Sequence, residues 1–233
     1  MNLAAIAESL PTYWAGLLTT LQLLALALAI GLAAAIPLAV LRASSRRVLG
    51  LPIGAPIWLC TYVIRGTPLL VQLFLIYYGL AQFEAVRASV LWPWLSSAWF
   101  CAVFAFAVNT CAYTTEMLAG AIRATPHGEV EAARAFGMSW ATAMRRIVLP
   151  SALRRALPAY SNEVIMMLHG TSLASIVTLL DLTGAAREMN SRFYLPFEAF
   201  VTAGVFYLAL TFVLVALFKR AEARWLAHLQ PRR

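Results

Sequence analysis

Charged side chains are scarce in this sequence: Asp, Glu, Lys and Arg make up 12% of its 233 residues, whereas about a quarter is usual in a soluble domain. Cysteine is also rare. The three cysteines lie in apolar stretches without a CxxC spacing, so we expect buried packing residues rather than a disulfide or metal site. No segment has the GxxxxGK(S/T) pattern of an ATP-binding phosphate loop. These shortages argue against an ordinary soluble domain, a metal site and an ATPase.

Apolar residues dominate instead, at 62% of the chain. Five apolar stretches are long enough to cross about 30 Å of hydrocarbon, which takes about 20 helical residues each. In lipid, only helices or closed barrels satisfy every backbone hydrogen bond, and stretches of this length require helices. The sequence therefore predicts an all-α integral membrane protein with five transmembrane helices, at Leu17–Leu41, Pro56–Gln82, Ser97–Gly120, Ala159–Leu180 and Ala199–Phe218.

Basic residues are distributed unevenly between the predicted loops. The loops at 42–55, 121–158 and 219–233 hold 14 of the 18 Lys and Arg residues. Because cytoplasmic loops retain positive charge, we expect a periplasmic N-terminus and a cytoplasmic C-terminus. The same asymmetry explains the net charge of +8. It favours contact with anionic membrane lipid and does not indicate a nucleic-acid partner.

We expect one transmembrane domain over residues 1–233, because no linker, low-complexity segment or internal repeat divides the chain. The absence of an inverted repeat argues against a secondary transporter that works alone. An odd number of helices suggests half of a transporter, which pairs with a second subunit. The first apolar run is too long for a cleavable signal peptide and lacks a preceding basic region, so we expect none.

A charged segment between two apolar stretches, Glu131–Pro150, reads EAARAFGMSWATAMRRIVLP. Residues 129–136 predict a short helix, because alanines favour helix and glutamate suits the N-terminal end of the helix dipole. Gly137 supplies the left-handed backbone that ends a helix, and Ser139 is a good N-cap for a second one. We expect this second helix to cover Trp140–Leu149 and to end at the proline that follows.

Two interpretations of this loop differ in what it contacts. Alanines and Gly137 let the bend approach a protein partner closely, with Phe136, Met138 and Trp140 as apolar anchors. Alternatively, the loop is an amphipathic segment on the membrane, and lipid headgroups contact its arginines, Arg145, Arg146, Arg154 and Arg155. The pattern alone favours the partner-docking interpretation.

Charged residues inside apolar stretches are costly and mark a transport pathway or an internal ion pair. Three such residues occur here, Arg65, Glu116 and Glu163. Asn109 and Glu116 are seven residues apart and share one helical face, while Asn162 adjoins Glu163. Two carboxylates and two amides that face one cavity suit a zwitterionic or cationic solute.

The second apolar stretch is interrupted at Gly66-Thr67-Pro68. Proline removes a backbone donor and disfavours helix at the residue before it. Broken helices are tolerated in membranes where they are buried or line a water-filled cavity, and they often form binding sites. We therefore place Gly66 and Thr67 in a pathway, with a simple kink as the alternative.

Other pathway candidates also have structural interpretations. Glu116 lies near one end of its helix and could form an ion pair with Arg123. The hydroxyls of Thr171 and Ser172 could bond to the backbone of their own helix, which is common in apolar helices. His169 lies deeper in its stretch and is read as a packing histidine.

Four motifs in register resemble the permease subunits of polar amino-acid ABC importers. They are residues 64–72 (IRGTPLLVQ), residues 109–120 (NTCAYTTEMLAG), the EAA segment that begins at Glu131, and residues 158–163 (PAYSNE). The resemblance covers almost the full chain and is strongest to the M-type subunits of histidine and lysine/arginine/ornithine importers of Gram-negative bacteria. It implies a type I permease fold in the bacterial inner membrane, with the coupling helix in the cytoplasmic loop at 121–158.

The resemblance also implies partners. A homologous Q-type permease would form a heterodimer with this chain, an ATPase homodimer would dock on the loop, and a periplasmic solute-binding protein would deliver the amino acid. ATP and Mg²⁺ would bind the ATPase, so this chain would hold no cofactor and no catalytic site. The residues expected to couple to the ATPase are Glu131, Ala132, Ala133, Phe136, Gly137 and Met138. Those expected in the substrate pathway are Glu163, Asn162, Thr171, Ser172, Glu116, Asn109, Gly66 and Thr67.

The expected function is to form half of an ATP-driven import pathway for histidine, arginine, lysine or ornithine. One departure bears on the substrate: many relatives carry Lys-Asp before Thr-Ser-Leu, where this chain has His169-Gly170. Opine permeases are similar too, so an octopine- or nopaline-type importer is the alternative. A self-sufficient transporter or channel would not need the loop at 129–150, and a membrane scaffold would transport nothing.

Overall fold

The structure, a computed structural model, describes residues 2–44, 47–48 and 51–226. Nearly all of this part of the chain is helical, apart from a two-residue antiparallel strand pair, β1 (Arg47–Val48) and β2 (Leu51–Pro52). The elements η1 and η3 are π-helical turns, and η2 and η4 are 3-10 turns. The helical elements are α1 (Leu3–Ala43), α2 (Gly54–Arg65), α3 (Leu69–Phe74), η1 (Leu75–Gly79), η2 (Leu80–Gln82), α4 (Glu84–Arg87), α5 (Trp92–Leu95), α6 (Ala98–Arg123), α7 (His127–Ala135), α8 (Trp140–Ala143), η3 (Met144–Val148), α9 (Leu149–Gly170), η4 (Thr171–Val177), α10 (Leu182–Phe193) and α11 (Pro196–Trp225).

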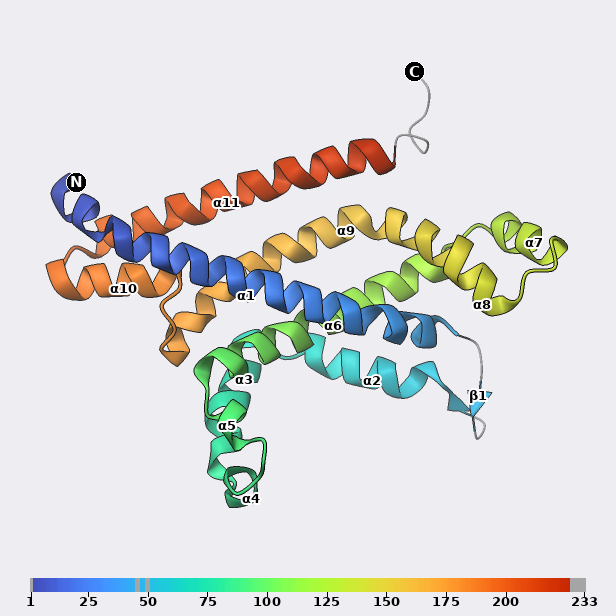
Figure 1. Cartoon of the computed structure of the whole chain (residues 1–233), viewed down its shortest axis with the longest axis horizontal. Coiled ribbons are helices and arrows are strands. Elements are labelled where there is room, and N and C mark those ends of the chain that lie inside the picture. Colours follow the sequence, from blue (N-terminus) through green and yellow to red (C-terminus); the bar gives the residue numbers. More distant parts are fainter. Residues whose placement is uncertain (1, 45–46, 49–50, 227–233) are drawn as a thin grey trace.

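Four long helices form the body of the molecule (Figure 1). The helices α1, α6, α9 and α11 run roughly along its long axis, with α6 packed against both α1 and α9. The helix α10 packs on α1 and α11 at the end that contains the N-terminus, and α7 and α8 lie at the opposite end. The long helices therefore share one general direction, with the loop between α6 and α9 at one end of it.

Three helices, α1, α6 and α11, are each long and apolar enough to span a membrane. Two further spans result if each of two bent pairs counts as one: residues 54–65 with 69–82, and residues 140–177 with 182–193. The apolar stretches expected from the sequence coincide with these elements, although α1 starts earlier, at Leu3. The expected number of five spans and the orientation of the termini stay predictions.

The sharpest bend, 98°, separates α2 from α3 at Gly66-Thr67-Pro68. Pro68 has an extended backbone, with ψ at 136°, which turns the chain out of the α2 axis. Beyond it, α3, α4 and α5 project sideways from the body before α6 returns to it (Figure 1). The predicted interruption of the second span is confirmed, and it is much larger than a simple kink.

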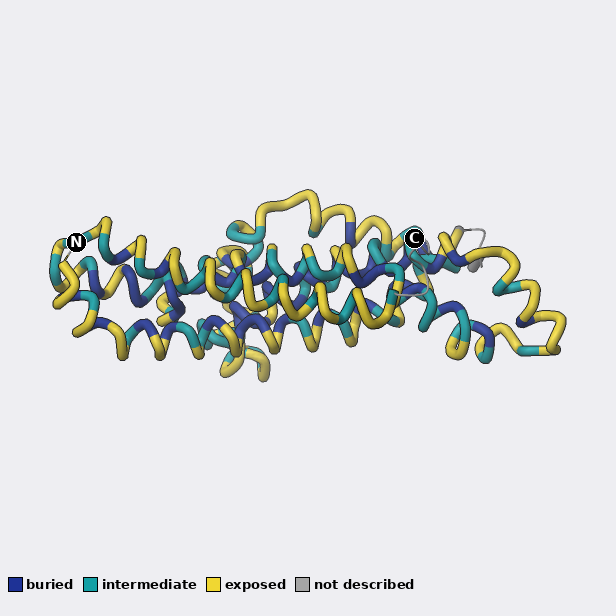
Figure 2. The backbone as a smooth tube through the Cα atoms, turned by 90° about the horizontal axis from the view of Figure 1, so that it is seen from above, coloured by how far each residue is buried: buried dark blue, intermediate teal, exposed yellow. Residues whose placement is uncertain are grey.

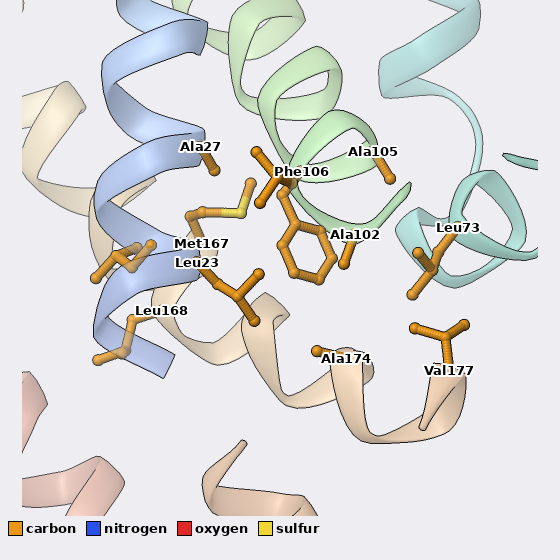
Figure 3. Packing of buried hydrophobic residues seen from close by; sticks show 12 residues of the cluster. Leu23, Ala27, Leu73, Ala102, Ala105, Phe106, Met167, Leu168, Ala174 and Val177 are labelled. Carbon is orange, nitrogen blue, oxygen red and sulfur yellow. The ribbon is translucent and has the colours of Figure 1, made fainter. Parts of the chain in front are cut away.

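Buried apolar residues form three clusters between the long helices. The middle cluster joins Leu23 of α1, Phe106 of α6 and Met167 of α9, with alanines filling the narrow spaces (Figure 3). The helices α1 and α6 come close at Gly31, where a Cβ atom would lie 2.4 Å from the Thr110 Cγ2. Small residues at helix contacts are typical of membrane proteins, because they let the backbones approach each other.

Exposed residues alternate with buried ones along the long helices (Figure 2), and many of the exposed residues are large and apolar. The buried share of the most apolar part of each helix is 61% in α6, 33% in α1 and 6% in α11. The helix α6 is thus the central one. The helices α1 and α11 present apolar side chains outward, as helices that face lipid do.

Two local expectations are wrong. The helical segment after Ser139 does not end at Pro150: α8 and η3 lead directly into α9, which carries Pro150 in its first turn. Proline has no backbone N–H, and the π-helical turn η3, which already departs from regular α-helical hydrogen bonding, directly precedes α9. The cysteines are not all buried, because Cys101 is buried but Cys60 is exposed on α2.

Candidate functional site

The loop between α6 and α9 has the local structure that its sequence predicts. The helix α7 ends at Ala135, and Gly137 follows with a φ of +69°. The Met138 N–H donates to the Ala133 carbonyl at 3.1 Å, which closes the turn. The Ser139 Oγ then accepts a hydrogen bond from the Thr142 N–H at 3.3 Å and caps α8. The predicted helix, tight turn and helix are confirmed.

Most of the motif residues in this loop face outward. Phe136 is 83% exposed, Met138 is half-buried and Ala133 is buried. A Cβ atom at Gly137 would meet nothing within 4 Å, so glycine suits this position through its backbone conformation alone. The loop forms the end of the molecule opposite the N-terminus (Figure 1). An exposed aromatic side chain on a well-defined turn is typical of the anchors that protein partners bind.

Two adjoining cavities of about 490 and 520 Å³ lie between α2, α6 and α9. We call them together the polar groove, and the residues that line both are Arg65, Tyr113, Glu163 and Met166. Six of the eight predicted pathway residues line one cavity or both: Gly66, Thr67, Asn109, Glu116, Asn162 and Glu163. Residues from the broken second span and from two other helices therefore meet in one place, as the sequence predicts.

A cation and a carboxylate face each other across the polar groove. The Arg65 guanidinium carbon lies 5.1 Å from the centre of the Tyr113 ring. The Tyr113 hydroxyl in turn donates to the Arg65 carbonyl at 3.2 Å, which fixes the end of α2 against α6. Glu163 lines the same cavities from α9. The groove thus holds the two kinds of charge that complement a zwitterion.

Gln72 holds the broken span together, although sequence reasoning did not single it out. Its Nε2 atom lies 2.6 Å from the Ile64 carbonyl, before the break, and 2.8 Å from the Thr67 Oγ1 within it. Its Oε1 atom accepts a hydrogen bond from the Asn109 Nδ2 at 3.1 Å. This side chain therefore ties α2, α3 and α6 together. Its place in the IRGTPLLVQ motif was the available signal.

Glu116 is engaged in an ion pair. The Arg42 Nε and the Thr61 Oγ1 lie 2.8 Å and 2.9 Å from the same Glu116 oxygen. The alternative interpretation of Glu116 as one half of an ion pair is confirmed, but the expected partner, Arg123, is wrong. The partner is Arg42 at the end of α1, and Arg123 is exposed. Glu163 has no ion-pair partner among the described residues. It is the carboxylate that is available in the polar groove.

Thr171 and Ser172 do not line the polar groove. The Thr171 hydroxyl is buried and donates to the Leu168 carbonyl at 2.6 Å, and the Ser172 hydroxyl donates to the His169 carbonyl at 2.7 Å. This is the back-bonding that the structural interpretation expects. Their place in the substrate pathway stays a prediction. The His169 Nε2 atom lies 3.3 Å from the Thr211 Oγ1 of α11, so the ring has the hydrogen-bond partner expected of a packing histidine, but it is exposed and lines one cavity of the groove.

A buried carboxylate that the sequence analysis missed lies near the N-terminal end of the body. Asp181 precedes α10 and accepts hydrogen bonds from the Gly184 N–H at 2.8 Å and from the Tyr207 hydroxyl at 3.1 Å. The adjacent Leu182 N–H donates to the Thr20 Oγ1 at 3.2 Å. This network joins α1, α10 and α11 away from the polar groove. Aspartate is a preferred N-cap, and that preference was the available signal.

Arg155 on α9 points inward and joins the two ends of the loop. One terminal nitrogen donates to the Ser151 Oγ at 2.6 Å. The other donates to the Ala121 carbonyl at 3.0 Å and to the Thr125 Oγ1 at 2.8 Å, in and just beyond the last turn of α6. The interpretation that placed Arg155 at lipid headgroups is therefore wrong for this residue.

Apolar helices around a polar groove, with an exposed helix–turn–helix at one end, define a membrane transport subunit. The profile of the family described as the binding-protein-dependent transport system inner membrane component matches residues 31–226. The chain belongs to this family and is a multi-pass protein of the inner membrane.

Individual relatives agree with this assignment. The chain is 52% identical to the histidine/lysine/arginine/ornithine transport system permease protein HisM of Escherichia coli, over 93% of this chain and 90% of the relative. It is 46% identical to the nopaline transport system permease protein NocM of Agrobacterium fabrum, over 95% and 91%. A crystal structure described as an amino acid ABC transporter with histidines matches with a TM-score of 0.83 and 35% identity, over 96% of this chain and 99% of that one. The MetNI methionine ABC transporter, at 17% identity and a TM-score of 0.76, shares the fold.

Proposed function

We propose that this chain forms half of the pathway of an ATP-driven importer for a polar or cationic amino acid. The observation that carries the proposal is the pair of opposite charges in the polar groove, Arg65 and Glu163. A guanidinium binds a carboxylate through paired hydrogen bonds, and a carboxylate binds an ammonium or guanidinium group. Because Glu116 is already paired with Arg42, Glu163 is the residue that remains for a cationic solute.

A second permease subunit would complete the groove. Arg65, Thr67 and Asn162 are polar and exposed in the single chain, although they lie at the depth of apolar spans. Polar groups and broken backbone at that depth need protein or water around them rather than lipid. A homologous Q-type permease packed over this face would supply the opposite wall and exclude lipid from the pathway.

The exposed loop would transmit the work of ATP hydrolysis. Phe136 and Met138 would seat in an ATPase homodimer, with Gly137 fixing the turn between α7 and α8. ATP and Mg²⁺ would bind that ATPase. Since η3 and α9 follow the loop without a break, a shift of the loop would move Glu163 on α9. A periplasmic solute-binding protein would deliver the amino acid to the side of the N-terminus.

The substrate class follows from the charge of the groove and from the names of the relatives. Permeases for histidine, lysine, arginine and ornithine are among the relatives, at 52% identity. These amino acids carry a side chain that is or becomes cationic, which Glu163 would bind. Nopaline and octopine permeases at 46% and 45% identity favour opines as the second candidate. Opines combine a guanidinium group with additional carboxylates, for which Arg65 would be the complement.

The decisive experiment is uptake by proteoliposomes that contain this chain, the neighbouring permease, the ATPase and the binding protein. Labelled histidine, arginine, lysine and octopine are offered with and without ATP inside. ATP-dependent uptake of one class names the substrate and supports an importer. Uptake that does not require ATP would instead indicate a secondary transporter, and lack of uptake of all four would contradict the proposed substrate class.

A further inference from the structure

Another cavity, of about 540 Å³, lies between the start of α9 and the end of α11, apart from the polar groove, and nothing in the proposed transport cycle uses it. It is lined by Pro150, Leu153 and Arg154 from α9 and by Arg224 and Trp225 from α11. Two guanidinium groups from different helices thus converge on one hollow. Neither has an ion-pair partner among the described residues, and Glu222, the nearest acidic residue along α11, is not part of the lining.

The position of this cavity corresponds to a membrane boundary. The apolar part of α11 ends at Lys219, and Arg224 lies five residues further, about 8 Å along a helix axis. The headgroup layer adds about 5–8 Å to each side of the hydrocarbon core, and side chains on a helix point back toward its N-terminal end, which for Arg224 is toward this layer. Trp225 is 54% exposed, and tryptophan is enriched at the same level of the bilayer. The cavity therefore lies where lipid phosphates lie.

We propose that Arg154, Arg224 and Trp225 form a binding site for the headgroup of an anionic phospholipid of the cytoplasmic leaflet. The two guanidinium groups bind the phosphate oxygens, because a guanidinium presents paired donors that match them. Leu153 and Pro150 contact the glycerol end of the acyl chains, and the Trp225 ring covers the opening. The side of the membrane rests on the proposed orientation of the chain, whereas the binding itself is independent of transport.

The site differs from a general attraction between basic residues and the membrane surface. Arg145 and Arg146, in η3, are equally cationic and exposed, but they line neither this cavity nor the polar groove. A diffuse attraction would depend on the number of arginines and not on their position. Binding at a specific site would instead depend on the two arginines that share the cavity.

Native mass spectrometry of the complete transporter, titrated with phosphatidylglycerol or phosphatidylcholine in detergent, tests this directly. The double variant Arg154→Gln, Arg224→Gln should bind phosphatidylglycerol about thirtyfold more weakly, as expected for two lost headgroup cations. Phosphatidylcholine binding should change little. The matched control is Arg145→Gln, Arg146→Gln, which removes the same charge outside the cavity and should bind like the unmodified protein.

Three results would overturn the proposal. Equal losses in both double variants would show a diffuse basic surface. Displacement of the lipid by millimolar inorganic phosphate would show a site for a free anion. Phosphatidylglycerol binding to the permease pair alone that disappears when the ATPase is added would assign the cavity to the protein partner.

If the double variant does not assemble, Arg154→Lys and Arg224→Lys separately keep the charge but lose the paired donors, and each should weaken binding. A failure of uptake with intact lipid binding would contradict the proposed function only.

Discussion

Arg42 and Glu116 form an ion pair across 2.8 Å that joins α1 to α6 at the edge of the polar groove. The two side chains are 21% and 15% exposed. Exposed pairs contribute about 0.5 kcal/mol, and removing one partner of a buried pair costs about 4 kcal/mol. Because the exposure of this pair lies between these two cases, we expect it to contribute measurably to the stability of the fold.

We expect Glu116→Leu to destabilise the permease by about 2 kcal/mol, since it leaves Arg42 partly buried without a counter-charge. Thermal unfolding of the purified permease pair measures this effect. The double variant Arg42→Met, Glu116→Leu should recover most of the loss, because both charges are then absent. Unchanged stability of Glu116→Leu, combined with reduced uptake, would instead place Glu116 in direct contact with the substrate.

Glu163→Gln should lower the kcat/KM for arginine uptake by about tenfold or more, because it removes the charge of a hydrogen-bond partner while keeping its size. Assembly with the other subunits should be unaffected. The matched control is Glu188→Gln, an exposed carboxylate on α10 that lies outside both cavities of the groove. Identical uptake kinetics in the two variants would remove Glu163 from the pathway.

The outline of the polar groove was accessible from sequence because its parts carry strong local signals. Proline after Gly66-Thr67 dictates a break, and carboxylates within apolar stretches stand out at once. The ion pair of Glu116 was not accessible in the same way. Its partner Arg42 is 74 residues away along the chain, and basic residues at the ends of apolar stretches all look alike until the helices are packed.

Hydrogen bonds between distant elements were missed for the same reason. Gln72 and Arg155 reach α6 from α3 and α9, which are not its neighbours in sequence, and Asp181 accepts a hydrogen bond from Tyr207, 26 residues further along the chain. In the loop, the turn at Gly137 and the cap at Ser139 were predicted correctly, because these residues determine a turn and a cap through their own local chemistry. Interactions within a few residues can thus be derived from sequence here, whereas tertiary partners cannot.

Gln72→Glu should disturb the broken span, because it replaces the amide donor that reaches the Ile64 carbonyl and the Thr67 hydroxyl by a carboxylate. Unpaired acceptors would then face each other, at a cost of about 2 kcal/mol. We expect a lower unfolding temperature and reduced uptake. Gln82→Glu is the control. That side chain lies in η2, in the segment that follows α3, and donates a hydrogen bond only to the Tyr78 carbonyl. Equal effects of the two changes would contradict the bridging role of Gln72.

Phe136→Ala should weaken the binding of the ATPase by about 2 kcal/mol, close to thirtyfold, if the exposed ring is an anchor of the interface. Co-purification of the ATPase at falling protein concentration measures the loss. Phe197→Ala is the matched control: this phenylalanine is 70% exposed, but it lies at the start of α11, at the other end of the body. ATPase binding that survives Phe136→Ala unchanged would show that the loop is not the docking site.

Gly137 tests the geometry of the same turn. Its φ of +69° is accessible to asparagine but costs a β-branched residue about 1–2 kcal/mol. We therefore expect Gly137→Val to lower ATP-dependent uptake and Gly137→Asn to retain most of it, with the substrate still bound by the solute-binding protein in both. Equal uptake by the two variants would mean that the shape of the turn is not needed for coupling.

Arg155 connects this turn to the pathway, because it bonds α9 to the carbonyl of Ala121 and the hydroxyl of Thr125 at the end of α6. If that link keeps the loop and α9 moving as one body, Arg155→Met should leave the ATPase bound and active but raise the ATP hydrolysed per solute imported. Arg145→Met, which removes an exposed arginine from the neighbouring η3, should leave that ratio unchanged. A purely structural role would lower stability, uptake and hydrolysis together, with the ratio constant. The ratio of hydrolysis to uptake in proteoliposomes therefore separates a link in the coupling path from a residue that only supports the fold.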